Sequence, residues 1–211
     1  ESLSNVPTAD YMHSKRANNP ERFLKRTKWF VYSIPGLKNY LSKTKFIHIT
    51  GTSGKGSTGA LLQSILAQKY PKVGFYNSPH VENVRERILV QSKDAKHSPI
   101  PENSFNELTD FLKPYLNKAL LTCPYGFPSY FEITLTIALL YFQQQKVRYC
   151  ILEVGCGGRY DATNIIPQNV LSLITSIGYD HEHLIGPALK DIAYEKSGII
   201  KKGGNVLIGN T

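Results

Sequence analysis

The sequence predicts an α/β fold, in which a mostly parallel sheet of the P-loop type carries helices on both faces. Short apolar runs that suit buried strands alternate with longer segments of helical periodicity, the order that produces a parallel sheet. The first of these strands also runs into a glycine-rich loop that opens a helix. The chain has 211 residues, 41% hydrophobic and 19% charged, which is enough for one sizeable globular domain.

The organising segment is KFIHITGTSGKGST, residues 45–58. Its first six residues suit a buried strand, and we expect the following helix to begin at Ser57 or Thr58. Three glycines lie in this segment: Gly51, Gly54 and Gly56. They allow a tight turn whose N–H groups point into one small concavity. The helix N-terminus and the charge of Lys55 are directed to the same place, so the loop can cradle a triphosphate.

This loop departs from the standard pattern G-x-x-x-x-G-K-[ST], because Ile49 takes the first position and Gly56 separates Lys55 from Ser57. An ordinary glycine-rich turn is therefore the alternative to phosphate binding, and the strand before and helix after the loop favour binding. The apolar stripe of the helix should consist of Leu61, Leu62, Ile65 and Leu66.

The remaining elements follow in order along the chain. Residues 1–44 form a polar, basic lead-in that we expect to pack on a main domain over residues 45–211. Further strands are expected over residues 72–76, 87–90, 149–154, 170–176 and 205–208. Helices are expected over residues 57–69, 105–121, 129–145 and 187–197. Residues 93–101 read as a polar loop.

Polar side chains follow several of these strands at their carboxyl ends, the edge where ligands bind in parallel sheets. Ser78, Glu153 and His181 each come at or just past the end of a different strand. A buried carboxylate at Glu153 requires a cation, and Mg²⁺ shared with triphosphate oxygens would supply it. The alternatives are an ion pair of Glu153 with Arg159 or Lys55, a turn role for Ser78 and a surface role for His181.

A second glycine-rich loop follows the strand that ends at Glu153. Its notable residues are Gly155, Gly157, Gly158, Arg159 and Asp161. The loop offers a second close approach of backbone to ligand, and we favour ligand binding there over simple turn chemistry.

Two other segments have structural explanations. Ser129, with Glu132 three residues later, forms a capping box before an apolar helix. Lys196, just before Gly198, is a cation in a last helical turn.

The composition of the chain limits the class of ligand and the cellular compartment that we expect. A net charge of +9 suits anionic ligands, while the scattered Lys and Arg residues, with no basic run interleaved with aromatics, argue against nucleic acid. Three cysteines without metal-type spacing indicate a reducing compartment. The longest apolar run, residues 133–142, is too short to cross a bilayer, and no signal-peptide pattern is present. We therefore expect a cytoplasmic protein with no membrane partner, and a monomer.

As a set, the motifs resemble the folylpolyglutamate synthase and dihydrofolate synthase family within the Mur-ligase superfamily. The resemblance covers about residues 46–209 and rests on six ordered motifs. They are GTSGKGST (51–58), YNSPH with NVRERI (76–88), SYFE (129–132), LEVGCGGRYDATN (152–164), TSIGYDH (175–181) and AYEKSGII (193–200). Ser53 and Cys156 depart from the Asn and Leu that are usual in the family.

The resemblance implies roles at the matching positions. The residues that would bind ATP are Thr52, Ser53, Gly54, Lys55, Gly56 and Ser57. Ser78 and Glu153 would bind one Mg²⁺, Glu153 and His181 a second, and a carbamylated Lys196 would support both metals. The catalytic group would thus be Lys55, Glu153, His181 and Lys196. The residues that would contact the pterin are Ser129, Tyr130, Phe131, Glu132, Tyr160, Asp161 and Ala162.

The implied reaction is an ATP-dependent amide ligation. The carboxylate of a folate or dihydropteroate attacks the γ-phosphate, and the amine of L-glutamate then displaces phosphate from the acyl phosphate. Positioning and charge neutralisation carry such phosphoryl transfer, so little protein nucleophile is needed. The family's central domain continues past Thr211 and a C-terminal domain follows it, so we expect this chain to be incomplete. The alternatives are another Mur-type amino-acid ligase and an inactive nucleotide-binding fragment.

Overall fold

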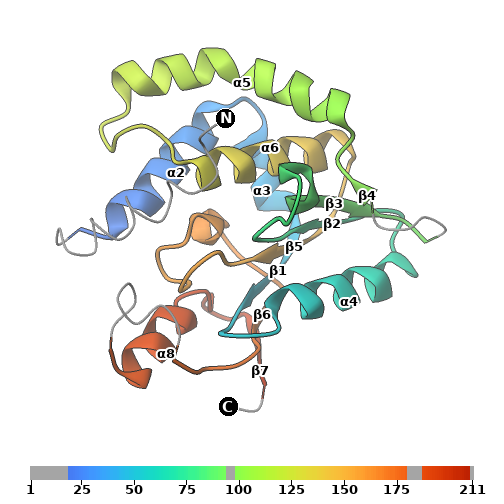
Figure 1. Ribbon diagram of the computed structural model, residues 1–211, viewed down its shortest axis with the longest axis vertical. Helices are drawn as coiled ribbons and strands as arrows, with labels where there is room; N and C mark the ends of the chain where they lie inside the picture. The colour runs from blue at the N-terminus through green and yellow to red at the C-terminus, as the bar shows by residue number, and fades with distance from the viewer. Residues whose placement is uncertain (1–18, 94–97, 180–186, 210–211) are drawn as a thin grey trace.

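Strands from all parts of the chain form a seven-stranded sheet in the order β4-β3-β2-β5-β1-β6-β7 (Figure 1). The computed structural model describes residues 19–93, 98–179 and 187–209. Five neighbouring strands are parallel: β2 (Val73–Tyr76), β5 (Tyr149–Glu153), β1 (Lys45–Thr50), β6 (Leu171–Ile174) and β7 (Asn205–Ile208). At one edge, β3 (Ile88–Gln91) and β4 (Ser98–Pro99) are antiparallel to their neighbours. The predicted mostly parallel α/β sheet is confirmed.

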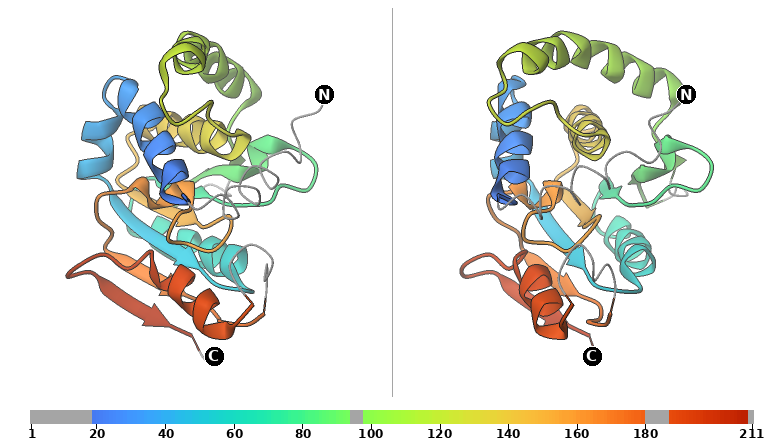
Figure 2. Two further views of the ribbon diagram at one scale, coloured as in Figure 1. Left: turned by 90° about the vertical axis from the view of Figure 1, so that its left-hand side faces the viewer. Right: turned by 60° about the vertical axis from the view of Figure 1, so that its left-hand side comes forward.

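Helices cover both faces of this sheet, and the two layers are seen from the side in Figure 2. One face carries α4 (Lys55–Ala67). The other face carries α2 (Glu21–Ser33), α3 (Leu37–Lys43), α5 (Glu102–Thr122) and α6 (Tyr130–Gln144). Two 3-10 turns, η1 (Val84–Arg87) and η2 (Ala162–Ile165), and the helix α8 (Leu189–Ser197) complete the described elements. None of the described helices is both long and apolar enough to cross a bilayer.

The core has two parts, one on each face of the sheet. Phe46 and Leu152 pack among the four helices on one side, whereas Ile49 and Ile151 pack against α4 on the other. Helices cover both faces of the sheet, so most successive residues of the central strands are apolar instead of alternating with polar ones. This is why the strands could be recognised as continuous apolar runs.

Residues 19–44 fold as α2 and α3 and share the larger core cluster. The fully buried apolar side chains of these two helices and their connection are Phe30, Val31, Ile34, Leu37 and Leu41. A buried ion pair between Arg26 on α2 and Glu132 on α6 joins this segment to the helix layer. These helices are thus integrated into the packing around the sheet.

The element boundaries lie close to the predicted ones, with two differences. Helix α4 begins at Lys55, before the predicted start at Ser57 or Thr58, so Lys55 and Gly56 belong to its first turn. The predicted polar loop at residues 93–101 contains the two-residue strand β4. A strand this short carries no periodicity that a sequence pattern could detect.

The predicted apolar stripe of α4 is wrong at two positions. Leu61 and Ile65 are each 66% exposed, and Gly59 and Gln63 face the sheet instead. A Cβ at Gly59 would come within 2.3 Å of the ring of Phe75, so the missing side chain lets the helix approach the sheet closely. The buried Gln63 amide donates to the Val73 carbonyl at 3.0 Å, which makes its burial acceptable.

Candidate active site

The glycine-rich loop between β1 and α4 forms the centre of the site. Gly54 adopts φ 80° and is the N-cap residue of α4, and no side chain caps the helix. The first N–H groups of α4 therefore keep their capacity to bind an anion, and the helix dipole reinforces it. The Lys55 ammonium donates to the Gly51 carbonyl at 2.9 Å, so the charge lies over the loop itself. A helix start of this kind suits a bound phosphate, and the cradle role of these residues stays a prediction.

The segment after β6 braces this loop. Ser53 N–H donates to the Ser176 hydroxyl at 3.0 Å, and the Thr175 hydroxyl donates to the Ser53 carbonyl at 2.6 Å. The Thr52 hydroxyl donates to the Gly178 carbonyl at 3.0 Å. These bonds fix the loop without a ligand. They also engage the polar groups of Thr52 and Ser53, so the first turn of α4 is the part best placed to contact phosphate.

Glu153 ends β5 beside this cradle. The residue is 3% exposed, and its Oε2 accepts the Ser78 N–H at 3.2 Å. The same oxygen lies 3.6 Å from the position of a Cβ on Gly56, within the first turn of α4. Burial raises the pKa of the Glu153 carboxyl, and it outweighs the opposing effects of the Ser78 N–H and of the nearby cations Lys55 and Arg87.

The carboxylate of Glu153 is not balanced by an ion pair within the described part of the chain. Its predicted alternative partner, Arg159, donates to the Tyr194 carbonyl at 3.1 Å and lies over the Tyr194 ring at 3.8 Å. Lys55 and Arg87 are near enough to act on Glu153, but neither forms an ion pair with it among the described residues, and a buried carboxylate of this kind fits a bound metal ion. Carboxylate and hydroxyl oxygens of Glu153 and Ser78, next to a phosphate cradle, match the few protein ligands that Mg²⁺ takes when phosphates supply the others.

The described residues contain no group of three or more His, Cys, Asp and Glu side chains that could hold a metal by itself. Such a metal would thus depend on the nucleotide. His181, the predicted second ligand, lies outside the described residues.

Asp161 orders the second glycine-rich loop. Its Oδ2 accepts the N–H groups of Gly155 at 3.1 Å and Cys156 at 3.2 Å. Its Oδ1 accepts the Thr163 N–H at 2.9 Å and the Thr163 hydroxyl at 2.5 Å. Burial raises the pKa of Asp161, while these four hydrogen bonds oppose the rise. Both oxygens are therefore occupied by the protein, which places Asp161 in a supporting role behind the loop surface.

The strand that feeds the phosphate loop is fastened to this second loop at two points. Thr50 donates to the Gly157 carbonyl at 2.7 Å. His48 Nε2 lies 2.7 Å from the Thr163 hydroxyl, whose own proton is given to Asp161, so Nε2 is the donor. Burial, with the charge of Lys201, lowers the pKa of His48 to about 3, which keeps the imidazole neutral. Sequence inspection did not single out His48, because it interrupts an otherwise apolar strand without any motif.

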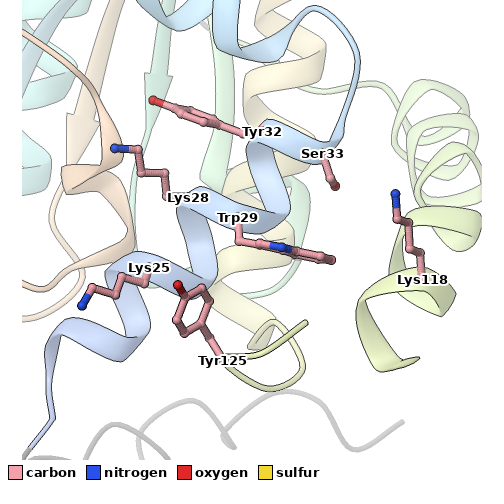
Figure 3. Close-up of a pocket in the computed structure, with 7 residues that line it drawn as sticks. All are labelled: Lys25, Lys28, Trp29, Tyr32, Ser33, Lys118 and Tyr125. Atoms are coloured by element: carbon pink, nitrogen blue, oxygen red, sulfur yellow. The ribbon is translucent and has the colours of Figure 1, made fainter. Parts of the chain in front are cut away.

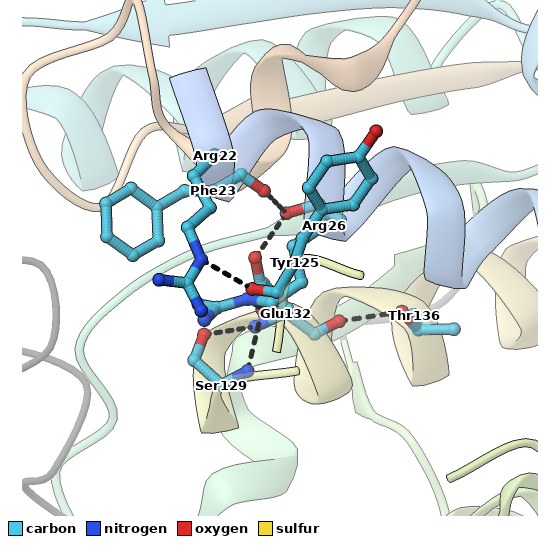
Figure 4. Close-up of polar contacts among 8 residues, drawn as sticks. Arg22, Phe23, Arg26, Tyr125, Ser129, Glu132 and Thr136 are labelled. Carbon is cyan, nitrogen blue, oxygen red and sulfur yellow. Dashed lines mark hydrogen bonds and ion pairs between the residues drawn. The ribbon is translucent and has the colours of Figure 1, made fainter. Parts of the chain in front are cut away.

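Ser129 and Glu132 form the predicted capping box at the start of α6. The carboxylate of Glu132 is also held by α2: it accepts from Arg26 Nε at 2.8 Å and from the Thr27 hydroxyl at 2.5 Å (Figure 4). Its Oε2 accepts the Ser129 N–H at 2.6 Å. Glu132 thus anchors the helix, which leaves the neighbouring aromatic side chains to face a ligand.

Tyr130 and Phe131 are partly buried at the start of α6, and Phe131 lies against the second glycine-rich loop. Phe131 packs edge-on against Tyr76, with ring centroids 5.5 Å apart, and its ring lies against Gly155. The Arg87 guanidinium lies 5.7 Å from the Tyr130 ring centroid. These contacts connect the start of α6 to the carboxyl ends of β2 and β5.

Arg87 is a site residue that sequence reasoning missed. It is buried at the end of η1, directly before β3, and donates to His80 Nδ1 at 2.8 Å. A charged residue at the start of an apolar strand was the available signal. Arg87 provides a fixed positive charge near Glu153 and Tyr130.

Lys196 occupies the predicted last turn of α8, before Gly198. The residue is 2% exposed. The end of α8 lies against the second glycine-rich loop, since the Arg159 N–H donates to the Glu195 carbonyl at 2.8 Å and Gly158 has no room for a Cβ beside that carbonyl. Of the two predicted neighbours of Asp161, Ala162 is buried and Tyr160 is partly exposed.

Comparison with known proteins gives a consistent result. No family model matches the chain. A dihydrofolate synthase/folylpolyglutamate synthase of Bacillus subtilis is 41% identical over 162 residues, which is 76% of this chain and 36% of the relative. Escherichia coli FolC in complex with ADP superposes with a TM-score of 0.74 at 31% identity, covering 88% of this chain and 41% of that one. An FPGS–AMPPCP–folate complex superposes with a TM-score of 0.80 at 32% identity, and the match covers 96% of this chain and 47% of that one. The chain spans about a third of the length of the curated relative.

Proposed function

We propose that this chain, which is related in sequence and fold to the folylpolyglutamate synthases and dihydrofolate synthases, carries the nucleotide-binding part of an ATP-dependent ligase. The reaction is the addition of L-glutamate to the carboxylate of a folate or dihydropteroate through an acyl phosphate. The observation that carries the proposal is the buried carboxylate of Glu153, which forms no ion pair with any described residue, beside a phosphate cradle with Lys55. Its support from relatives is that two of the matching structures hold ADP, or AMPPCP with folate.

On the nucleotide side, the first turn of α4 binds the phosphates through its N–H groups. Lys55 exchanges the Gly51 carbonyl for a phosphate oxygen and neutralises charge there. Glu153 and Ser78 would hold one Mg²⁺, and Glu153 and His181 would hold a second. When bound, Mg²⁺ neutralises the phosphate oxygens that gain charge during transfer. Because the loop is already braced by the segment after β6, little of it has to be ordered when ATP binds.

On the acceptor side, Tyr130, Phe131 and Tyr160 offer partly exposed aromatic surfaces for the pterin ring. Glu132 and Asp161 support them from behind, because the protein occupies both oxygens of each carboxylate. Ser129 and Ala162 belong to the same two supporting turns. Aromatic faces of this kind bind planar heterocycles by stacking.

Lys196 is assigned as a carbamate in the active enzyme. A buried ammonium near two divalent ions would be repelled, whereas a carbamate is an anion that supports them. No disulfide joins Cys123, Cys150 and Cys156, all of which are described in the structure, and this suits a reducing compartment; we place the enzyme in the cytoplasm as a monomer.

The test is product analysis of the full-length gene product with ATP, Mg²⁺ and L-glutamate. Dihydropteroate, tetrahydrofolate and a nucleotide-sugar peptide are offered as separate acceptors. Glutamylation of either pterin by mass spectrometry supports the proposal, and ligation only to the sugar peptide assigns a different Mur-type ligase. Lys55→Ala should slow ligation roughly a few hundredfold, the effect of removing one preorganised charge from the transition state, about 3–4 kcal/mol. Near-normal turnover would refute the phosphate-cradle assignment.

A further inference from the structure

A surface pocket of about 480 Å³ lies on the outer side of α2, facing the C-terminal part of α5 and the loop that leads to α6 (Figure 3). Its lining residues are Lys25, Lys28, Trp29, Tyr32, Ser33, Lys118 and Tyr125. In Figure 3 the Trp29 indole lies between α2 and α5, with the Tyr125 ring next to Lys25. The candidate active site uses none of these residues.

The pocket is a consequence of how α2 is patterned. The inner face of the helix packs into the core with Phe23, Arg26, Thr27, Phe30 and Val31. The pocket residues at positions 25, 28, 29 and 32 have the i, i+3, i+4, i+7 spacing of one helix face, here the opposite one. Two large aromatic side chains lie on this face, Trp29 and Tyr32; both are partly buried and pack against the edge of the core, and the rest of their surface lines the pocket. The pocket therefore offers an apolar, flat surface to a ligand.

The charges in the pocket have one sign. Three of the seven lining residues are lysines and none is a carboxylate. Lys25 forms an ion pair with Glu21 at 3.1 Å, but both side chains are more than half exposed, so the pair is weak. Lys28 and Lys38 both lie over the Tyr32 ring, at 5.6 Å and 5.7 Å from its centroid. An anion would relieve the repulsion among these cations.

We propose that this pocket binds a planar aromatic anion that carries two or more carboxylates or phosphates. The aromatic part stacks on Trp29, and the anionic groups contact Lys25, Lys28 and Lys118. Its volume lies within the roughly 300–1,000 Å³ typical of small-molecule sites. Two sources share this chemistry, a pteroyl oligo-γ-glutamate and a nucleoside triphosphate. The inference does not depend on the proposed ligase activity.

Trp29 is the single tryptophan of the chain, so its fluorescence reports on the pocket directly. The experiment titrates the chain separately with pteroyl-tri-γ-glutamate and with ATP in the absence of Mg²⁺. Isothermal calorimetry is run in parallel, because both probes absorb ultraviolet light. A Lys55→Ala background weakens nucleotide binding at the phosphate loop, and the pocket variant described next separates binding in the pocket from binding of the pteroyl probe at the proposed acceptor surface.

The variant Lys28→Gln/Lys118→Gln removes two charges from the pocket. The matched control Lys43→Gln/Lys69→Gln removes two exposed lysines outside it. We expect the pocket variant to bind at least one probe roughly tenfold more weakly, because two charge contacts are lost, while the control is unchanged. The probe that responds identifies the source of the ligand. Equal affinity of the two variants for both probes, or no binding of either probe, would overturn the inference.

Discussion

The buried pair Arg26–Glu132 should be worth more to the fold than any other ion pair described in the chain. The two side chains are 7% and 3% exposed, and the bond between Arg26 Nε and Glu132 Oε2 measures 2.8 Å. Removing one member of such a pair leaves an uncompensated buried charge, which typically costs about 3–5 kcal/mol of unfolding free energy. Removing both members leaves no charge behind and is often far less costly.

The structure allows the two single substitutions to be ranked. In Arg26→Met the Glu132 carboxylate keeps its hydrogen bonds from Thr27 and Ser129, so the loss should lie near the lower value of about 3 kcal/mol. In Glu132→Gln the guanidinium stays buried and loses its anion, so the loss should be larger. The double variant should be less destabilised than the sum of the two, by roughly 2 kcal/mol or more.

The measurement is urea unfolding of the four proteins in this cycle, followed by Trp29 fluorescence and circular dichroism. The control cycle is Lys113→Met with Asp110→Asn, an exposed i,i+3 pair on α5 at 2.7 Å. That pair should contribute no more than about 0.5 kcal/mol. Additive single effects at Arg26 and Glu132, each below about 1 kcal/mol, would refute the reasoning.

Three further outcomes are expected. Folding raises the pKa of the Glu153 carboxyl above its ordinary value of 4.5, so the ionised form of this group disfavours folding once the pH exceeds that value. Without Mg²⁺, Glu153→Gln should therefore be more stable than the parent at pH 7 and no more stable below about pH 4. A parent that unfolds at higher urea than this variant at pH 7 contradicts the prediction. Gly59→Ala should destabilise the chain by about 1–3 kcal/mol despite the better helix propensity of alanine, and Phe75→Leu should recover part of the loss if the ring contact is the cause. Lys196→Ala should abolish ligation in the full-length gene product, and a short-chain carboxylic acid should restore part of it; full activity of the variant would make the lysine structural.

Sequence reasoning located the helices and strands because the central strands are buried on both faces, a feature that sequence patterns detect well. The strands around Phe46 and Leu152 are buried on both faces, so they stand out as apolar runs between helices. The error on α4 has the opposite origin. A pattern that scores large apolar residues selected Leu61 and Ile65, whereas close packing against Phe75 requires a small residue at Gly59.

For the site, motifs named residues but could not give the direction of their side chains. Glu132 and Asp161 belong to motifs that suggest ligand contact, and both turn out to be surrounded by protein donors. Those donors come from α2 and from loop N–H groups, which no local pattern links to the two carboxylates. Arg87 was missed for the same reason, since its importance comes from its distance to Glu153 and Tyr130.

These supporting contacts explain how the two halves of the site can act together. Strand β1 leads directly into the phosphate loop, and its side chains Thr50 and His48 are bonded to the loop that Asp161 orders. A displacement of the phosphate loop along the direction of β1 would therefore strain the Gly157 and Thr163 contacts, and through them the surface that is proposed to hold the acceptor. Neutral His48 suits this role, because it donates a hydrogen bond inside the sheet without placing a charge there. The short connection makes β1 the element through which binding of nucleotide and binding of acceptor would influence each other.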